Sequence, residues 1–122
     1  MRKIIKISGN EYSIKSSAWT SFKYQNDTGR NLLDDIQSIR DKVQDKSTEE
    51  IISALQGMLD VVYRITYNMI TEADEKQVGS YEEFLKGLDN VMEDNAWLMD
   101  SLQCAIAPLS GGTKKDSPQI QQ

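Results

Sequence analysis

The chain has 122 residues, of which 39% are apolar and 27% are charged, and its 14 basic and 19 acidic side chains give a formal net charge of −5. This composition suits one folded domain and argues against nucleic-acid or anionic-membrane partners, which are bound mainly by clustered Lys and Arg. The sequence contains no histidine and one cysteine, which removes the commonest general base and any internal disulfide.

A β-hairpin is predicted at the start of the chain. Gly9 and Asn10 suit a two-residue turn, because both tolerate positive φ. That turn pairs Ile7 with Tyr12 and Ile5 with Ile14, with the four apolar side chains on one face. The hairpin is either a lid on a helical core or a self-association edge, in which the strands that carry these four residues pair with a neighbouring subunit.

Two short helices are predicted next. Ser17 is a suitable N-cap for the first, in which Trp19 and Phe22 are spaced for one face. Gly29 ends this helix, and Asn31 begins the second helix in the same way.

The third predicted helix is the longest and is expected to be central. Ser47 and Glu50 form a capping box, and an apolar stripe of helical period continues to about Asp74. Gly57 lies inside this helix, where glycine costs up to about 1 kcal/mol relative to alanine. We expect it to mark the close approach of another helix.

Two more helices complete the predicted bundle. Ser80 and Glu83 form a second capping box, and Asn95 caps a last helix that Pro108 ends. The sequence thus predicts a mainly α fold, in which an N-terminal hairpin precedes a bundle of about five helices. The expected organisation is a single domain over residues 1–109, with the hairpin at 1–16, the bundle at 17–109 and a disordered tail at 110–122.

The sequence offers no catalytic, cofactor-binding or metal-binding residues. Three acidic pairs, Asp34–Asp35, Glu49–Glu50 and Glu82–Glu83, lie in the first turns of predicted helices, where negative charge is stabilised by the helix dipole. Cys104 lies beside Ala105 and is predicted to be a small buried side chain. We therefore expect no enzyme.

Four soft or aromatic side chains are candidates for a partner-binding surface. Tyr63 and Tyr67 lie beside the main apolar stripe, and Met92 and Met99 are adaptable in shape. An irregularly packed core explains the same residues, and the sequence leaves both interpretations open.

Four stretches in order carry a family resemblance: ISGNEYSIK, FKYQNDTGRNLLDDI, VVYRITYNMITEADEKQVGSYEEFLKGLDNV and WLMDSLQCAIAPLS. In this layout the chain resembles the tail assembly chaperones of long-tailed phages and prophages of Gram-positive bacteria. The resemblance covers nearly the whole chain and depends on the order and spacing of these stretches.

The resemblance implies a protein that binds and solubilises the tape measure protein and helps to recruit tail tube (major tail) subunits during tail morphogenesis. It implies a homo-oligomer in the bacterial host cytoplasm that is not in the mature virion, with no nucleic acid or membrane partner. It also implies a longer frameshifted product, for which Thr113–Lys114–Lys115 is a candidate slippery site. The alternative is a small helical adaptor or regulatory protein that binds a cellular protein.

Overall fold

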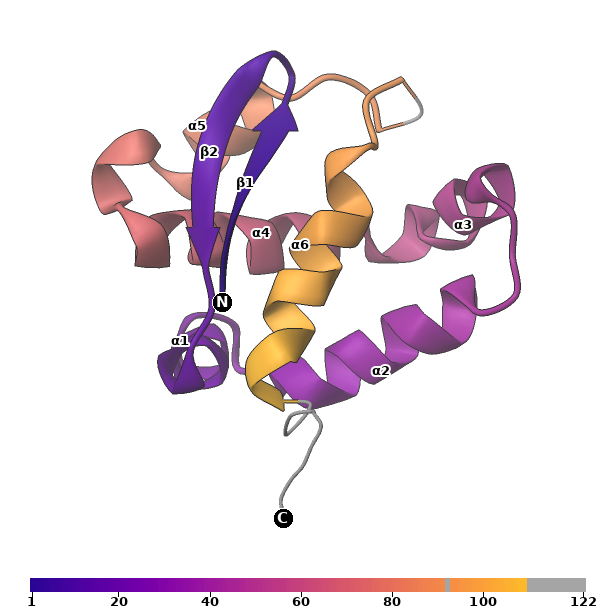
Figure 1. Ribbon diagram of the computed structural model, residues 1–122, viewed down its shortest axis with the longest axis horizontal. Helices are drawn as coiled ribbons and strands as arrows, with labels where there is room; N and C mark the ends of the chain where they lie inside the picture. The colour runs from indigo at the N-terminus through magenta and orange to yellow at the C-terminus, as the bar shows by residue number, and fades with distance from the viewer. Residues whose placement is uncertain (92, 110–122) are drawn as a thin grey trace.

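The computed structural model describes residues 1–91 and 93–109, without the side chain of residue 48. Met92, the expected disordered tail and the candidate slippery site lie outside the described residues. The predicted mainly α fold with an N-terminal hairpin is confirmed (Figure 1). The strands are β1 (Arg2–Ile7) and β2 (Asn10–Lys15). The α-helices are α1 (Ala18–Thr28), α2 (Leu32–Val43), α3 (Thr48–Ala54), α4 (Leu59–Ala73), α5 (Tyr81–Lys86) and α6 (Trp97–Ile106). The short 3-10 helices are η1 (Gln56–Met58), η2 (Glu75–Gln77) and η3 (Ala107–Leu109).

The hairpin register differs from the predicted one. Ile7 pairs with Asn10, and the turn residues are Ser8 and Gly9, with φ of 53° and 84°. Two consecutive positive φ values are those of a type I′ turn, whose second position favours glycine. The body of the protein also holds this turn. The Ser8 N–H donates to Asp94 Oδ2 at 2.7 Å, and Ser8 Oγ accepts from the Asp89 N–H at 2.7 Å.

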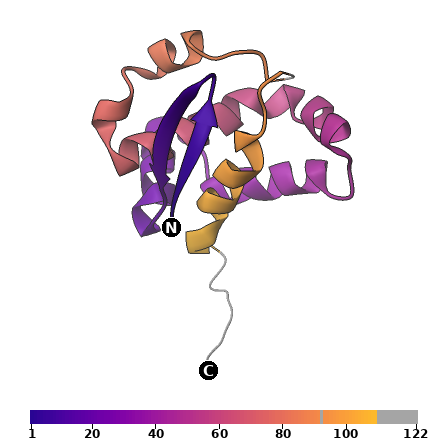
Figure 2. The ribbon, with the colours of Figure 1, turned by 45° about the horizontal axis from the view of Figure 1, so that its top comes forward.

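The shared apolar face of the hairpin survives the change of register. Side chains alternate along a strand, so a partner that shifts by two positions stays on the same face. Ile5, Ile7 and Ile14 are buried, and Tyr12 packs edge-on against Phe84 with ring centroids 6.2 Å apart. The hairpin lies over α4 and beside α6 and covers this part of the core (Figure 2).

The long helix predicted from residue 47 to residue 74 is wrong, because the chain breaks into α3, η1 and α4. The break follows Leu55 and includes Gly57, where low helix propensity makes a change of direction cheap. It lets α3 fold against α2 while α4 contacts β2, α1, α5 and α6. A Cβ at Gly57 would meet nothing within 4 Å, so the expected close helix approach is also wrong.

Most of the predicted helix ends are confirmed, and one is wrong. The N-cap position of the last helix is Ala96 instead of the predicted Asn95, whose side-chain amide donates to the Val91 carbonyl at 2.8 Å. Helix α6 instead begins at Trp97 with no side-chain cap. Confirmed are the capping boxes Ser47–Glu50 and Ser80–Glu83, the N-caps Ser17 and Asn31, and the left-handed C-cap Gly29.

One apolar core joins the hairpin to all six α-helices. Its centre is α4, which buries Val62, Ile65 and Met69 completely or nearly so. A buried polar contact also joins α4 to α6, since Thr66 Oγ1 and Ser101 Oγ lie 2.6 Å apart. This core fixes α6 relative to α2 and so determines the shape of the surface between them.

Candidate partner-binding groove

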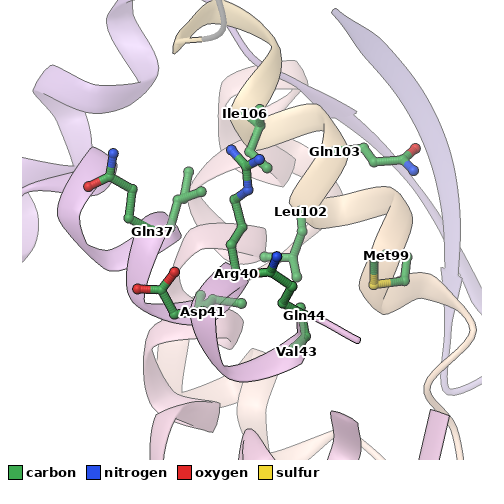
Figure 3. A pocket seen from close by; sticks show the side chains of 11 residues that line it. Gln37, Arg40, Asp41, Val43, Gln44, Met99, Leu102, Gln103 and Ile106 are labelled. Atoms are coloured by element: carbon green, nitrogen blue, oxygen red, sulfur yellow. The ribbon is translucent and has the colours of Figure 1, made fainter. Parts of the chain in front are cut away.

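A groove of about 800 Å³ lies between α2 and α6 (Figure 3). Helix α6 lines it with Met99, Leu102 and Ile106, at spacings of three and four residues, which place them on one face. Helix α2 supplies the opposite wall, with Ile36, Ile39, Val43 and neighbouring polar residues. Two helices with facing apolar stripes form the kind of groove that accepts a third amphipathic helix.

The floor of the groove is rigid and its rim is adaptable. Ile39 is fully buried and Leu102 is 5% exposed, so both belong to the packed core. Met99 is 45% exposed and lies on the rim. Its thioether side chain is unbranched and can follow the shape of different apolar partners. The groove therefore has a buried apolar floor, formed by Ile39 and Leu102, and an exposed methionine at its rim.

Two charged side chains of α2 line the same groove. Arg40 extends towards α6, and Asp41 follows it (Figure 3). Both are exposed, and neither makes an ion pair within the described part of the chain. The groove thus offers one positive and one negative group to a partner.

A second, smaller hollow of about 190 Å³ lies between α1, the start of α2 and η3. Phe22 and Leu33 line it and are 62% and 43% exposed, and Leu109 contributes from η3. The other described residues that line it are uncharged: Ser21, Gln25, Asn31 and Leu32. Two large apolar side chains exposed beside each other at an uncharged hollow are typical of an interaction surface.

The sequence did not predict that the aromatic side chains Trp19 and Phe22 of α1 are exposed. Trp19 and Phe22 do share a face, but that face points to solvent, with Trp19 52% exposed. The opposite face of α1 is held by polar contacts, because Ser17 Oγ and Thr20 Oγ1 donate to the Glu72 carboxylate at 2.6 and 2.7 Å. The spacing of residues 19 and 22 shows that they lie together, while the direction they face depends on Glu72, which lies 52 residues after Thr20.

A buried polar cluster fixes α1 beside α2. Tyr24, which is 1% exposed, donates its hydroxyl to Asp35 Oδ2 at 2.5 Å. Arg30 donates to both Asp35 oxygens, at 2.7 and 2.8 Å. Burial of Asp35 opposes its ionisation, but these hydrogen bonds more than compensate, and the pKa of Asp35 is lowered. Asp35 therefore does more than stabilise a helix N-terminus, since it holds together the two helices that line the smaller hollow.

The two candidate tyrosines lie in aromatic clusters away from the groove. Tyr63 stacks on Trp97 with ring centroids 5.8 Å apart, and burial raises the pKa of Tyr63. Tyr67 packs against Tyr81 and Phe84, and its hydroxyl donates to the Gly79 carbonyl at 2.7 Å. Both side chains are partly buried against the core. Of the candidate partner-binding residues, Met99 lines the groove, and Met92 lies outside the described residues.

The hairpin residues proposed as a self-association edge point inward, since Ile5, Ile7 and Ile14 belong to the core. The outer side of β2 is also engaged. The Gln77 side chain accepts from the Ser13 N–H at 2.7 Å and donates to the Ser13 carbonyl at 2.9 Å. A neighbouring strand that paired with β2 would have to displace Gln77. Pairing through the strand edges stays a prediction.

Reactive side chains are not gathered into a site within residues 1–91 and 93–109. No group of three or more Cys, Asp or Glu side chains in these residues could hold a metal ion. Cys104 is buried as predicted, and burial is the main reason that its pKa is raised. In the same residues, no helix is both long enough and apolar enough to cross a membrane.

Comparisons of the chain with protein-family models, with curated proteins and with solved structures find no match.

Proposed function

We propose that the chain is a tail assembly chaperone of a long-tailed phage or prophage, which binds the tape measure protein and keeps it soluble while tail tube subunits are recruited. The groove between α2 and α6 is the observation that carries this proposal. In the family that the sequence resembles, the tape measure partner is a long, helix-rich and apolar chain. Such a chain aggregates when its apolar faces are bare, and a helix-binding groove covers them.

The negative net charge of the protein suits a role in keeping a partner soluble. A net charge of −5 keeps the bound complex apart from other complexes and limits aggregation. Among the described residues, the groove is lined by one basic and one acidic side chain, so its apolar floor is open to a helix of either charge. In the proposed setting the protein acts in the host cytoplasm, as a homo-oligomer, and does not enter the finished virion.

Co-expression with a candidate tape measure protein tests the function. We expect the wild-type chain to move that protein into the soluble fraction and to co-purify with it. The Met99→Asp variant should lose at least about tenfold in binding, because a carboxylate would be desolvated in the apolar groove. The matched control is Ile4→Asp on the outer face of the hairpin, where Ile4 is 71% exposed, and it should bind like the wild type.

Two results would contradict the proposal. The first is a tape measure protein that stays insoluble and does not co-purify. The second is a gene neighbourhood without a very long gene downstream, which would favour the adaptor interpretation. Equal binding by the Met99→Asp and Ile4→Asp variants would remove the groove from the proposal.

A further inference from the structure

We propose that the outer face of the hairpin is a second partner-binding surface, which takes a short acidic segment with an apolar side chain at its centre. The segment belongs to a protein other than the occupant of the groove. None of the described residues that line the groove comes from the hairpin. The inference is therefore separate from the proposed function, and either can fail without the other.

The strand register determines which hairpin side chains point outward. Ile5, Ile7 and Ile14 are buried, and side chains alternate between the two faces along each strand. The hairpin lies over α4, so its other face is turned away from the helices (Figure 1). This outer face, which we call the cationic face, consists of the three cross-strand pairs Arg2–Lys15, Ile4–Ser13 and Lys6–Glu11.

The cationic face differs in charge from the rest of the protein. Its three basic side chains and one acidic side chain give a net charge of +2 in a chain whose total is −5, which leaves −7 for the other residues. Arg2, Lys6 and Lys15 take part in none of the ion pairs among residues 1–91 and 93–109. Charge complementarity therefore favours an acidic partner.

The positive charge is concentrated at the open end of the hairpin. Arg2 lies directly opposite Lys15, where side chains are about 4.5–5.5 Å apart at their Cβ atoms and like charges destabilise the strand pair. Lys6 is balanced by Glu11, which lies opposite it. A carboxylate placed between Arg2 and Lys15 would turn this repulsion into two attractions, so these two residues form the main acid-binding position.

An apolar side chain lies at the centre of the cationic face. Ile4 is 71% exposed, more than any other large apolar side chain of the described residues. It is two positions from both Arg2 and Lys6 on the same strand. A partner therefore needs an apolar residue between acidic ones. It lies across the face rather than beside β2, because Gln77 occupies the edge of that strand at Ser13.

The small extent of the face favours a short segment over a long polyanion. Each strand has six residues and is about 20 Å long. Beyond the turn, Ser8 is bound to Asp94 and to the backbone of Asp89. A nucleic-acid duplex or an anionic bilayer extends past the hairpin and meets the negative charge of the body, whereas a segment of a few residues does not. Two copies of the chain each carry −5 and repel each other overall.

Synthetic peptides provide the test, through fluorescence anisotropy with the full-length chain. The first peptide has a central leucine with two glutamates on each side, within a Gly- and Ser-based chain. The second has glutamine in place of glutamate, and the third has alanine in place of leucine. We expect the first to bind, more weakly as salt is raised, and the second to bind at least about tenfold more weakly than the first.

Charge reversal in the protein tests the acid-binding position. Lys15→Glu should weaken the first peptide at least about tenfold, because it replaces an attraction by a repulsion. The same change sets opposite charges across the strands, so the Tm should not fall, and loss of binding is distinguished from unfolding. Lys42→Glu is the matched control, since Lys42 is exposed on α2, does not line the groove, and changes the net charge equally.

A second variant tests the apolar centre. Ile4→Ser should weaken the leucine peptide and leave the alanine peptide nearly unchanged, because only the leucine peptide has an apolar contact to lose. Equal effects of Ile4→Ser on both peptides would remove Ile4 from the surface and overturn this part of the inference.

Three results would overturn the inference as a whole. They are absence of binding by the first peptide, equal binding by the glutamate and glutamine peptides, and equal effects of Lys15→Glu and Lys42→Glu. Tighter binding to phosphatidylserine vesicles or to a DNA duplex, lost in Lys15→Glu, would assign the face to an extended polyanion instead. Self-association in sedimentation velocity that Lys15→Glu abolishes and Lys42→Glu keeps would assign it to a second copy. Solubilisation of the tape measure protein in co-expression would still support the proposed function in each case.

Discussion

Replacing Tyr24 by phenylalanine should destabilise the protein without creating a cavity. The change removes the hydroxyl that donates to Asp35 at 2.5 Å. A hydrogen bond to a charged group contributes about 1.5–3 kcal/mol. Because Arg30 still donates to both Asp35 oxygens, no unpaired carboxylate is left, and we expect the lower part of that range. A loss of about 1.5 kcal/mol lowers the Tm of a domain of this size by about 6 °C.

The size of this effect should depend on pH. The folded-state pKa of Asp35 lies below its unfolded value of about 3.9. Its stabilisation is therefore present above about pH 4 and is lost as the pH falls through the folded pKa. Burial first, and then Asp35, raise the pKa of Tyr24, so the hydroxyl stabilises the fold up to about pH 10 and loses that effect above it. The difference between wild type and Tyr24→Phe should be largest between these limits.

Urea unfolding followed by circular dichroism, at pH 7 and at a series of pH values below about 4, measures this difference. Tyr63→Phe is the matched control, since it removes the same atom, and the Tyr63 hydroxyl makes no hydrogen bond within the described residues. We expect the control to stay within about 0.5 kcal/mol of the wild type. Equal losses for Tyr24→Phe and Tyr63→Phe at pH 7, or a Tyr24→Phe loss that does not shrink anywhere as the pH is lowered below about 4, would refute the role given to Asp35.

Two further predictions concern Gly9 and Gly57, and the cysteine. Gly9→Ala should destabilise the fold by about 1–2 kcal/mol, because φ at Gly9 is 84°, whereas Gly57→Ala, in open space without positive φ, should stabilise it by about 0.4–1 kcal/mol. Thermal unfolding of both variants checks this, and shifts of the same sign would contradict the two backbone assignments. Cys104, buried and with a raised pKa, should react with iodoacetamide only as the protein unfolds. Fast alkylation of the native protein would contradict the burial of Cys104.

Local sequence signals predicted where four of the six described α-helices begin but not the hairpin register. The Ser47 and Ser80 capping boxes need only residues three apart, so local spacing was sufficient. The turn at Ser8 and Gly9 is held by Asp89 and Asp94, more than 80 residues away. Turn chemistry by itself allowed Ile7 to pair with either Tyr12 or Asn10. The hydrogen bonds of Ser8 with Asp89 and Asp94 accompany the observed pairing with Asn10.

The candidate groove was predictable only in part. The spacing of Met99, Leu102 and Ile106 indicates an apolar face on α6. The exposure of Met99 and the burial of Leu102 depend on how α2 packs against α6, and these helices are far apart in the sequence. The outward face of Phe22 was missed for a similar reason, because polar contacts to Glu72 determine how α1 is rotated.

Site-specific crosslinking tests the central claim, that the groove between α2 and α6 binds a helical partner. A photo-reactive amino acid replaces Met99 in one variant and Ile4 in another, both of which are exposed positions. After co-expression with the tape measure protein and irradiation, we expect a covalent adduct from position 99 and none from position 4. An adduct from position 4 without one from position 99 would place the partner on the hairpin and contradict the claim.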